Sequence, residues 1–160
     1  ERRRGAVSGF RRGVRLGIDV GKARVGVARV DPDGMLAVPV ETVPRDDSSI
    51  ARITAIAAEY SPIEVVVGLP LNMQGGDTPS TADARAFAAE LHRALPGTVI
   101  RMVDERLSTV TAHTALRQSG RSQKKSRGIV DQIAAVVFLQ HAVDTEKRTG
   151  SAPGFVVDEE

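Results

Sequence analysis

Four acidic residues occupy positions from which they could share one bound cation: Asp19, Asp104, Glu105 and Asp131. Asp19 ends the apolar segment "RLGID", Asp104 and Glu105 follow the apolar segment "TVIRMV", and Asp131 begins a long helical pattern, "DQIAAVVFLQ". Carboxylates that converge repel one another and lose hydration, which is costly unless a cation compensates. Mg²⁺ prefers a few carboxylates together with water and phosphate oxygens. The set therefore predicts a Mg²⁺ or Mn²⁺ site, in which two ions could activate water for phosphodiester cleavage.

Each acid also has an ordinary structural interpretation. Asp19 could cap the turn that follows it, because Asp side chains often accept hydrogen bonds from the backbone two residues on. Asp104 and Glu105 could pair with Arg106, and Asp131 could stabilise the N-terminus of its helix. Taken one residue at a time, the sequence leaves both interpretations open.

The surrounding pattern predicts the elements that would hold these acids. Short β-branched runs and turn signals predict three antiparallel strands, then two strands alternating with helices. The expected strands are 15–20, 24–30, 35–43, 63–70 and 98–105, with helices over 49–59, 80–94, 108–119 and from about 128 onward. The fold class is thus α/β, a five-stranded mixed sheet flanked by helices. Pro39 indicates an edge strand or a bulge.

If the first, fourth and fifth strands are parallel neighbours, their carboxyl ends meet at one edge of the sheet. Ligands of open α/β sheets collect at that edge. This is the expected location of Asp19, Asp104 and Glu105. Strand alternation sends Asp104 and Glu105 to opposite faces, which favours Glu105 as the metal ligand with Asp104 as the alternative.

Two further segments could contact a polyanion. The loop "GLPLNMQGGDTPS" offers Asn72 and Gln74 as hydrogen-bond donors to phosphate, or is simply a connection between a strand and a helix. The run "GRSQKKSRG", expected to be a loop, places Arg121, Lys124, Lys125 and Arg127 just before Asp131. Such a run is often only a solvated loop, but beside a carboxylate site it would bind a nucleic-acid backbone without reading its sequence.

Composition limits the other classes of protein. The chain has 160 residues, a net charge of +2 and no Cys, which excludes disulfides, thiolate metal sites and a cysteine nucleophile. Its lack of Cys fits a cytoplasmic protein, and no apolar run approaches the roughly 20 residues of a membrane span. We expect a flexible basic arm over 1–13, a single folded α/β domain over 14–147 and an irregular acidic tail over 148–160.

Four motifs in order and spacing resemble one family: "GIDVGKARVGVA", "VVVGLPLNMQGG", "VDERLSTVTA" and "DQIAAVVFLQ". Over roughly residues 14–144 the chain is similar to the YqgF-like (RuvX) family of the ribonuclease H-like superfamily, which comprises Holliday junction resolvases and nucleases for precursor 16S rRNA. The resemblance implies a ribonuclease H-like fold and hydrolysis of phosphodiester bonds. By the same resemblance Asp19, Glu105 and Asp131 match the acids of the family's first strand, its "DER" motif and its last helix.

The resemblance leaves the substrate open between a four-way DNA junction and precursor rRNA. Symmetric cutting of a junction requires a homodimer, whereas a trimming nuclease could act as a monomer. Two other functions are compatible with the residues. "DVGKARVG" also resembles the phosphate loop of actin-like ATPases, but those proteins enclose the nucleotide between two such domains and this chain has no internal repeat. A non-catalytic nucleic-acid-binding module in ribosome assembly is the second alternative.

Overall fold

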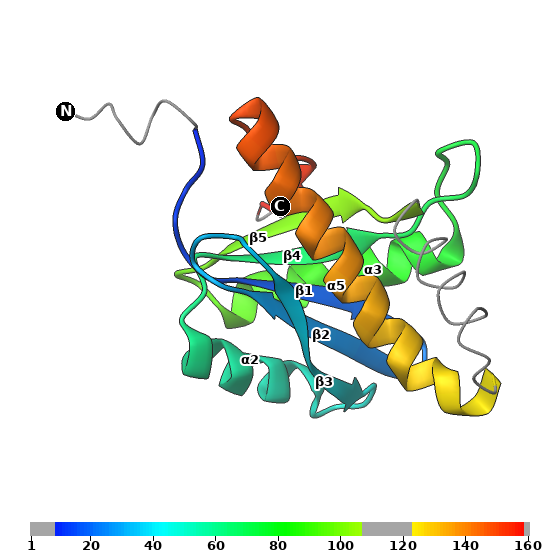
Figure 1. The fold of residues 1–160 in the computed structure, drawn as a ribbon. Coiled ribbons are helices and arrows are strands. Elements are labelled where there is room, and N and C mark those ends of the chain that lie inside the picture. The colour runs from blue at the N-terminus through cyan, green and yellow to red at the C-terminus, as the bar shows by residue number, and fades with distance from the viewer. Residues whose placement is uncertain (1–8, 107–122, 159–160) are drawn as a thin grey trace.

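The computed structural model describes residues 9–106 and 123–158, and for residues 123–131 the backbone alone. The helix expected over 108–119 and the predicted contact residue Arg121 lie outside these ranges. Figure 1 shows the elements, which follow one another as β1 (Arg15–Val20), β2 (Arg24–Val30), β3 (Ala37–Pro44), α2 (Ser49–Tyr60), β4 (Glu64–Leu69), α3 (Pro79–Ala94), β5 (Val99–Asp104), α5 (Gln123–Thr149) and β6 (Phe155–Val156).

The strands form one mixed sheet in the order β3-β2-β1-β4-β5-β6. β1 pairs with β2 and β2 with β3 in antiparallel fashion, whereas β1 with β4 and β4 with β5 are parallel. The prediction of a mixed α/β sheet is therefore confirmed, including the parallel neighbours β1, β4 and β5. Pro39 lies in edge strand β3, where the register also shifts, so both expectations for it are met.

A sixth strand, β6, was not predicted. It has two residues and pairs antiparallel with β5 through Arg101↔Val156 and Met102↔Phe155. A two-residue strand after "APG" is too short to show an alternating pattern, so the sequence offers no signal for it.

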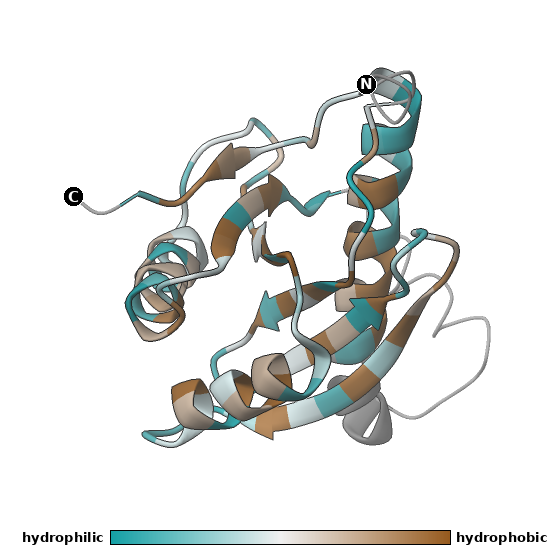
Figure 2. Ribbon diagram, turned by 90° about the vertical axis from the view of Figure 1, so that its left-hand side faces the viewer, coloured by the Kyte–Doolittle hydropathy of each residue, from teal (hydrophilic) through white to brown (hydrophobic). Residues whose placement is uncertain are grey.

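Helices cover the two faces of the sheet. α2 and α3 lie against one face, and α5 (yellow to red in Figure 1) crosses the other. The α2/α3 face is packed by a cluster that includes Leu16, Ile18, Val65, Val67 and Met102. On the α5 face, Val66 and Val103 of the sheet pack with Phe138, Leu139 and Val143 of α5. Both faces of the sheet are thus covered, and Figure 2 shows apolar residues (brown) along its strands, interrupted by polar ones (teal).

Helix α5 begins earlier than the sequence suggests. The prediction of a loop at "RSQKKSR" is wrong from Gln123 onward, because the backbone is helical from there to Thr149. Gln, Lys and Arg have good helix propensity, and one Gly at 128 is tolerated within a long helix. Lys124, Lys125 and Arg127 thus belong to the first turns of α5. Among the described helices, none is long and apolar enough to cross a membrane.

Local turn chemistry fixes the ends of the elements. Asp31 accepts hydrogen bonds from the backbone N–H groups of Asp33, Met35 and Leu36, and Gly34 adopts φ 67°, which closes the predicted "DPDG" turn. At the start of α3, Thr78 and Thr81 form a reciprocal capping box.

Candidate active site

Asp19 lies near the end of β1, in the middle of the sheet. Its Cα pairs with that of Gly26 in β2, and Gly26 pairs in turn with Thr42 in β3. Two residues earlier, Gly17 faces α5, since a β-carbon built there would lie 3.0 Å from Cβ of Leu139. Because side chains alternate along a strand, Asp19 lies on the α5 face too, where it is half-buried.

Glu105 follows directly after β5 and is 9% exposed. Its backbone N–H donates to the carbonyl of Leu69 at 3.3 Å, which continues the β4–β5 pairing by one residue. Its carboxylate lies over Gly68 of β4, where an added β-carbon would collide with Oε1 of Glu105. Glu105 therefore occupies space above the neighbouring strand.

Asp19 and Gly68 are neighbours by register. Ile18 of β1 pairs with Val67 of β4, so the next residue of each parallel strand, Asp19 and Gly68, continues the same ladder. The Glu105 carboxylate, which covers Gly68, thus lies beside Asp19 on the same face of the sheet. Two acids separated by more than eighty residues in sequence meet at the predicted edge.

The backbone of α5 brings Asp131 over the same place. Asp131 precedes Ala135 by one helical turn, and the Ala135 carbonyl oxygen would lie 3.1 Å from a β-carbon on Gly17. The next residue, Gln132, donates from Nε2 to Oγ1 of Thr42, which belongs to the same cross-strand row as Asp19. The first turns of α5 therefore lie above the row that carries Asp19. The Asp131 side chain itself is outside the described side chains.

Asp104 has a different environment from Glu105. It follows Val103, which packs on the α5 face, so alternation turns Asp104 to the other face. Arg106 donates to both carboxylate oxygens of Asp104, with Nη2 2.6 Å from Oδ2, and this hydrogen bonding holds the pKa of Asp104 below its usual value. Asp104 is therefore an ion-pair partner in this structure.

The loop between β4 and α3 is braced by its own residues. Oδ1 of Asn72 accepts hydrogen bonds from the backbone N–H groups of Gln74 and Gly76, and Gly75 adopts φ 85°. Nη1 of Arg106 lies 3.4 Å from the carbonyl oxygens of Asn72 and Met73. Asn72 and Gln74 are exposed, at the same end of the sheet as Glu105.

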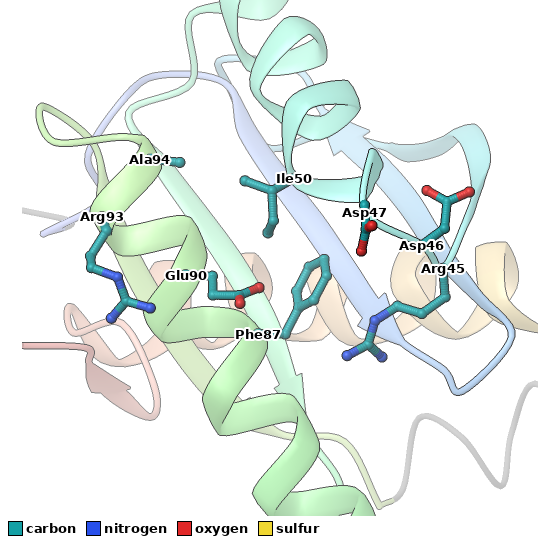
Figure 3. Close-up of a pocket in the computed structure, with 8 residues that line it drawn as sticks. All are labelled: Arg45, Asp46, Asp47, Ile50, Phe87, Glu90, Arg93 and Ala94. Atoms are coloured by element: carbon teal, nitrogen blue, oxygen red, sulfur yellow. The ribbon is translucent and has the colours of Figure 1, made fainter.

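A pocket on the opposite face was not foreseen from the sequence. It lies between α2 and α3 (Figure 3) and is lined by Arg45, Asp46, Asp47, Ile50, Phe87, Glu90, Arg93 and Ala94. Arg45 donates to both oxygens of Asp83, at 2.8 and 2.9 Å, and stacks over the Phe87 ring. Arg45 of this pocket is thus already paired with Asp83. The acids on the α5 face therefore remain the candidate active site.

The donor set on the α5 face fits a hard divalent cation. Carboxylate oxygens are the ligands that Mg²⁺ takes from proteins. Among the side chains that the structure describes, no group of three His, Cys, Asp or Glu residues is close enough to hold a metal ion. Asp19 and Glu105 supply two carboxylates, and the third acid of the predicted set, Asp131, lies outside those side chains.

The order of the strands and the helices on both faces define a ribonuclease H-like α/β fold. A solved RuvC structure from Thermus thermophilus, in complex with a Holliday junction substrate, aligns with a TM-score of 0.55 at 18% identity, covering 89% of this chain and 99% of that one. A second T. thermophilus RuvC structure aligns with a TM-score of 0.53 at 17% identity, over 89% of this chain and 99% of the other.

The chain belongs to the RuvX family, described as a Holliday junction resolvase, which matches residues 13–145. A relative from Streptomyces avermitilis is 52% identical over 91% of this chain and 95% of its own length. Another, from Clavibacter michiganensis, is 53% identical over 92% of this chain and 93% of its own. Both carry the name "Putative pre-16S rRNA nuclease". The predicted family and fold, and the prediction of a nuclease, are confirmed.

Proposed function

We propose that this chain is a metal-dependent nuclease that cleaves phosphodiester bonds in precursor 16S rRNA, in the cytoplasm. The observation that carries the proposal is the meeting of Asp19 and the Glu105 carboxylate on one face of the sheet, beneath the turns of α5 that contain Asp131. The names of relatives above 50% identity support rRNA as the substrate. The family description supports a four-way DNA junction as the second candidate.

Asp19, Glu105 and Asp131 would hold Mg²⁺ or Mn²⁺. When bound, the ion would stabilise the negative charge that develops on the phosphate and on the leaving oxygen. Glu105 is buried, so its negative charge is weakly screened by water and strongly favours a cation beside it.

The nucleic-acid backbone would be held by two segments beside these acids. Lys124, Lys125 and Arg127, in the first turns of α5, and Arg121 just before them would attract phosphates on the Asp131 side. Asn72 and Gln74 of the exposed loop after β4 would contact phosphates on the Glu105 side.

The test is cleavage of a precursor 16S rRNA fragment and of a four-way DNA junction by one preparation of the protein. We expect cutting of the rRNA fragment with Mg²⁺ and none with EDTA. Asp19→Asn should lower the rate by more than about 100-fold, because loss of a group that only supports a metal ligand already costs about 10- to 100-fold. Cleavage by Asp19→Asn at the wild-type rate would contradict the proposal and favour a binding module.

The same preparation separates the remaining alternatives. Cleavage of the junction with two symmetric cuts, together with a dimer on size-exclusion chromatography, would assign the second substrate and the predicted homodimer. Thermal stabilisation by ATP rather than by Mg²⁺ or Mn²⁺ would favour a nucleotide-binding domain.

The basic segment is tested by changing Lys124 and Lys125 together to Ala. With each phosphate contact removed, binding releases fewer counterions from the nucleic acid. Affinity should therefore fall, and the slope of log affinity against log salt concentration should become shallower by about one unit per contact. Filter binding of the rRNA fragment at several salt concentrations measures both. Unchanged affinity and slope would remove the segment from the binding surface.

A further inference from the structure

Gly68 is a buried glycine whose backbone conformation does not explain it. It lies inside β4, and it is not among the glycines of the described residues that adopt a positive φ. Any residue could adopt this backbone, and a glycine within a strand usually weakens it. The reason for a glycine here must be the space beside it.

That space is filled by Glu105 and by a ring of α5. A β-carbon on Gly68 would collide with Oε1 of Glu105 and would lie 3.1 Å from its Cδ and 2.8 Å from Cε2 of Phe138. The carboxylate of Glu105 thus occupies the volume where β4 would otherwise present a side chain. Gly68 is also next to Asp19 by register, because Ile18 of β1 pairs with Val67 of β4 and the two strands are parallel.

We propose that Gly68 is a positioning residue of the active site, whose missing side chain lets the Glu105 carboxylate fold back over β4 and lie beside Asp19. This inference rests on the proposed function. Without the gap at residue 68, Glu105 would have to turn away from β4, and the distance between the two carboxylates would increase. The position of the second metal ligand is therefore set by a residue that cannot touch metal or substrate through a side chain.

The first experiment is Gly68→Ala, with Gly97→Ala as the matched control. A β-carbon on Gly97 meets nothing within 4 Å, and its φ lies outside the positive range, so the control adds the same methyl group without a collision. We expect kcat of Gly68→Ala to fall about 100-fold, as misplacement of a reacting group by about 1 Å can cause, while KM changes little. The Mg²⁺ concentration for half-maximal rate should rise. Gly97→Ala should match the wild type in all three values.

A second experiment tests the inference without the Gly68→Ala variant, which could fail to fold. Glu105→Ala removes the carboxylate from the space over Gly68. The carboxylate introduced by Gly68→Asp can then lie where that of Glu105 lay, once the Phe138 ring, whose Cε2 lies 2.8 Å from the added β-carbon, shifts slightly. We expect the double variant Gly68→Asp/Glu105→Ala to cleave at least about tenfold faster than Gly68→Asn/Glu105→Ala, which has the same shape without the charge. A merely structural role of Gly68 would not produce this difference.

Two results would overturn the inference. One is a folded Gly68→Ala variant with wild-type kcat and Mg²⁺ dependence. The other is equal cleavage by the double variants Gly68→Asp/Glu105→Ala and Gly68→Asn/Glu105→Ala. Failure of the proposed function looks different: then Asp19→Asn cleaves as well as the wild type, or the wild type does not cleave at all.

Discussion

Asp104 and Glu105 are adjacent carboxylates with different surroundings. Asp104 is exposed and paired with Arg106, which holds its pKa low through charged hydrogen bonds. Glu105 is buried over Gly68 on the α5 face, beside the strand that carries Asp19. An exposed ion pair of this kind contributes little to the stability of the protein. A buried carboxylate is costly unless a cation or hydrogen-bond donor lies beside it, so it interacts strongly with a neighbouring cation. The two residues should therefore differ strongly in their contribution to cleavage.

We expect Glu105→Gln to lower the single-turnover rate of cleavage by more than about 100-fold, since in the proposed site Glu105 would bind the metal directly rather than support a ligand. Asp104→Asn should lower it by less than about tenfold, because it disturbs only the contact of Arg106 with the loop after β4. Rates measured at saturating Mg²⁺ would compare the two variants. An Asp104→Asn variant as inactive as Glu105→Gln would assign the metal to Asp104 instead.

Much of this site could be predicted from the sequence, because its signals are local. Asp19 interrupts an apolar strand, and the order of strands brings Asp19 and Glu105 to one edge. The role of Gly68 could not be derived in this way. A glycine within a strand indicates a close approach, but nothing in the sequence says that the approaching group is the Glu105 carboxylate.

At the scale of elements, α5 is the part that would complete the proposed site. It crosses the sheet close to β1, because Gly17 has no side chain to hold it away: Cβ of Leu139 and the carbonyl oxygen of Ala135 would lie 3.0 and 3.1 Å from a β-carbon there. Asp131 lies one turn before Ala135 on the same helix. The separation of α5 from β1 therefore sets how near Asp131 comes to Asp19.

Gly17→Ala tests this spacing. The added methyl group should push α5 outward and destabilise the protein by about 1–3 kcal/mol, the usual cost of overpacking a core. Cleavage should also fall, because Asp131 moves with the helix. Urea unfolding gives the free energy, and Gly97→Ala, which meets nothing within 4 Å, is the control. If Gly17→Ala has wild-type stability and activity, then Gly17 does not set the separation of α5 from β1.

The elements differ in how well the sequence predicts them. The strands of the sheet centre follow from β-branched runs and turn residues, and β4 is buried throughout, as its continuous apolar run predicts. The start of α5 was missed because "RSQKKSR" has no apolar periodicity, although its residues favour helix.

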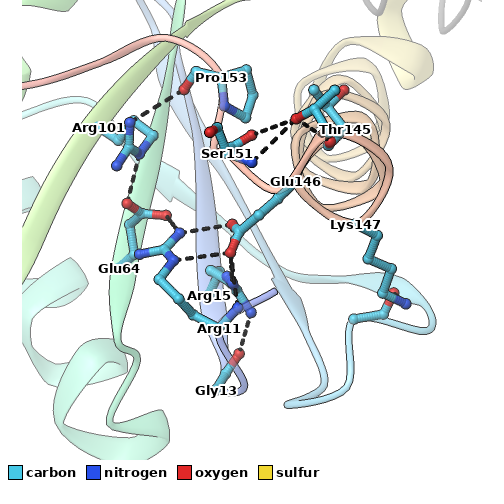
Figure 4. A network of polar contacts seen from close by, with 12 residues as sticks. Arg11, Gly13, Arg15, Glu64, Arg101, Thr145, Glu146, Lys147, Ser151 and Pro153 are labelled. Carbon is cyan, nitrogen blue, oxygen red and sulfur yellow. Dashed lines mark hydrogen bonds and ion pairs between the residues drawn. The ribbon is translucent and has the colours of Figure 1, made fainter. Parts of the chain in front are cut away.

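At the scale of the whole molecule, an ionic network of buried residues and the exposed Arg11 joins distant segments at the end of the sheet away from Asp19 (Figure 4). Arg11 and Arg15 bind Glu146 of α5, with Nη2 of each 2.8 and 3.1 Å from Oε1 of Glu146. Arg11 also binds Glu64 of β4 at 3.0 Å, and Arg101 of β5 binds the other oxygen of Glu64 at 2.6 Å. Residue 11 of the predicted arm is thus tied to the domain.

Such a network could not be predicted from the sequence, because its partners lie up to 135 residues apart. Its acids and bases look like ordinary surface charges until the fold buries them: Arg15, Glu64 and Glu146 are each at most 2% exposed. Removal of one partner would leave the others buried and unpaired, which commonly costs about 3–5 kcal/mol.

Glu146 makes the stability of this network depend on pH. Burial acts to raise its pKa, but hydrogen bonds from Arg11 and the charge of Arg15 outweigh it and lower the pKa from 4.5 to about 2. A carboxylate with a lowered pKa stabilises the fold above its unfolded-state pKa, and this contribution is lost as the pH falls from 4.5 through 2.

Glu146→Gln should therefore be about 3–5 kcal/mol less stable than the wild type at pH 7. The difference between the two proteins should shrink as the pH falls from 4.5 toward 2, because the protonated wild-type side chain comes to resemble Gln. Urea unfolding at several pH values measures it, with Asp33→Asn, which removes the exposed Arg12–Asp33 pair, as a control within about 1 kcal/mol of the wild type. A difference that stays constant from about pH 7 to about pH 2 would mean that Glu146 is not what anchors the N-terminal segment to α5.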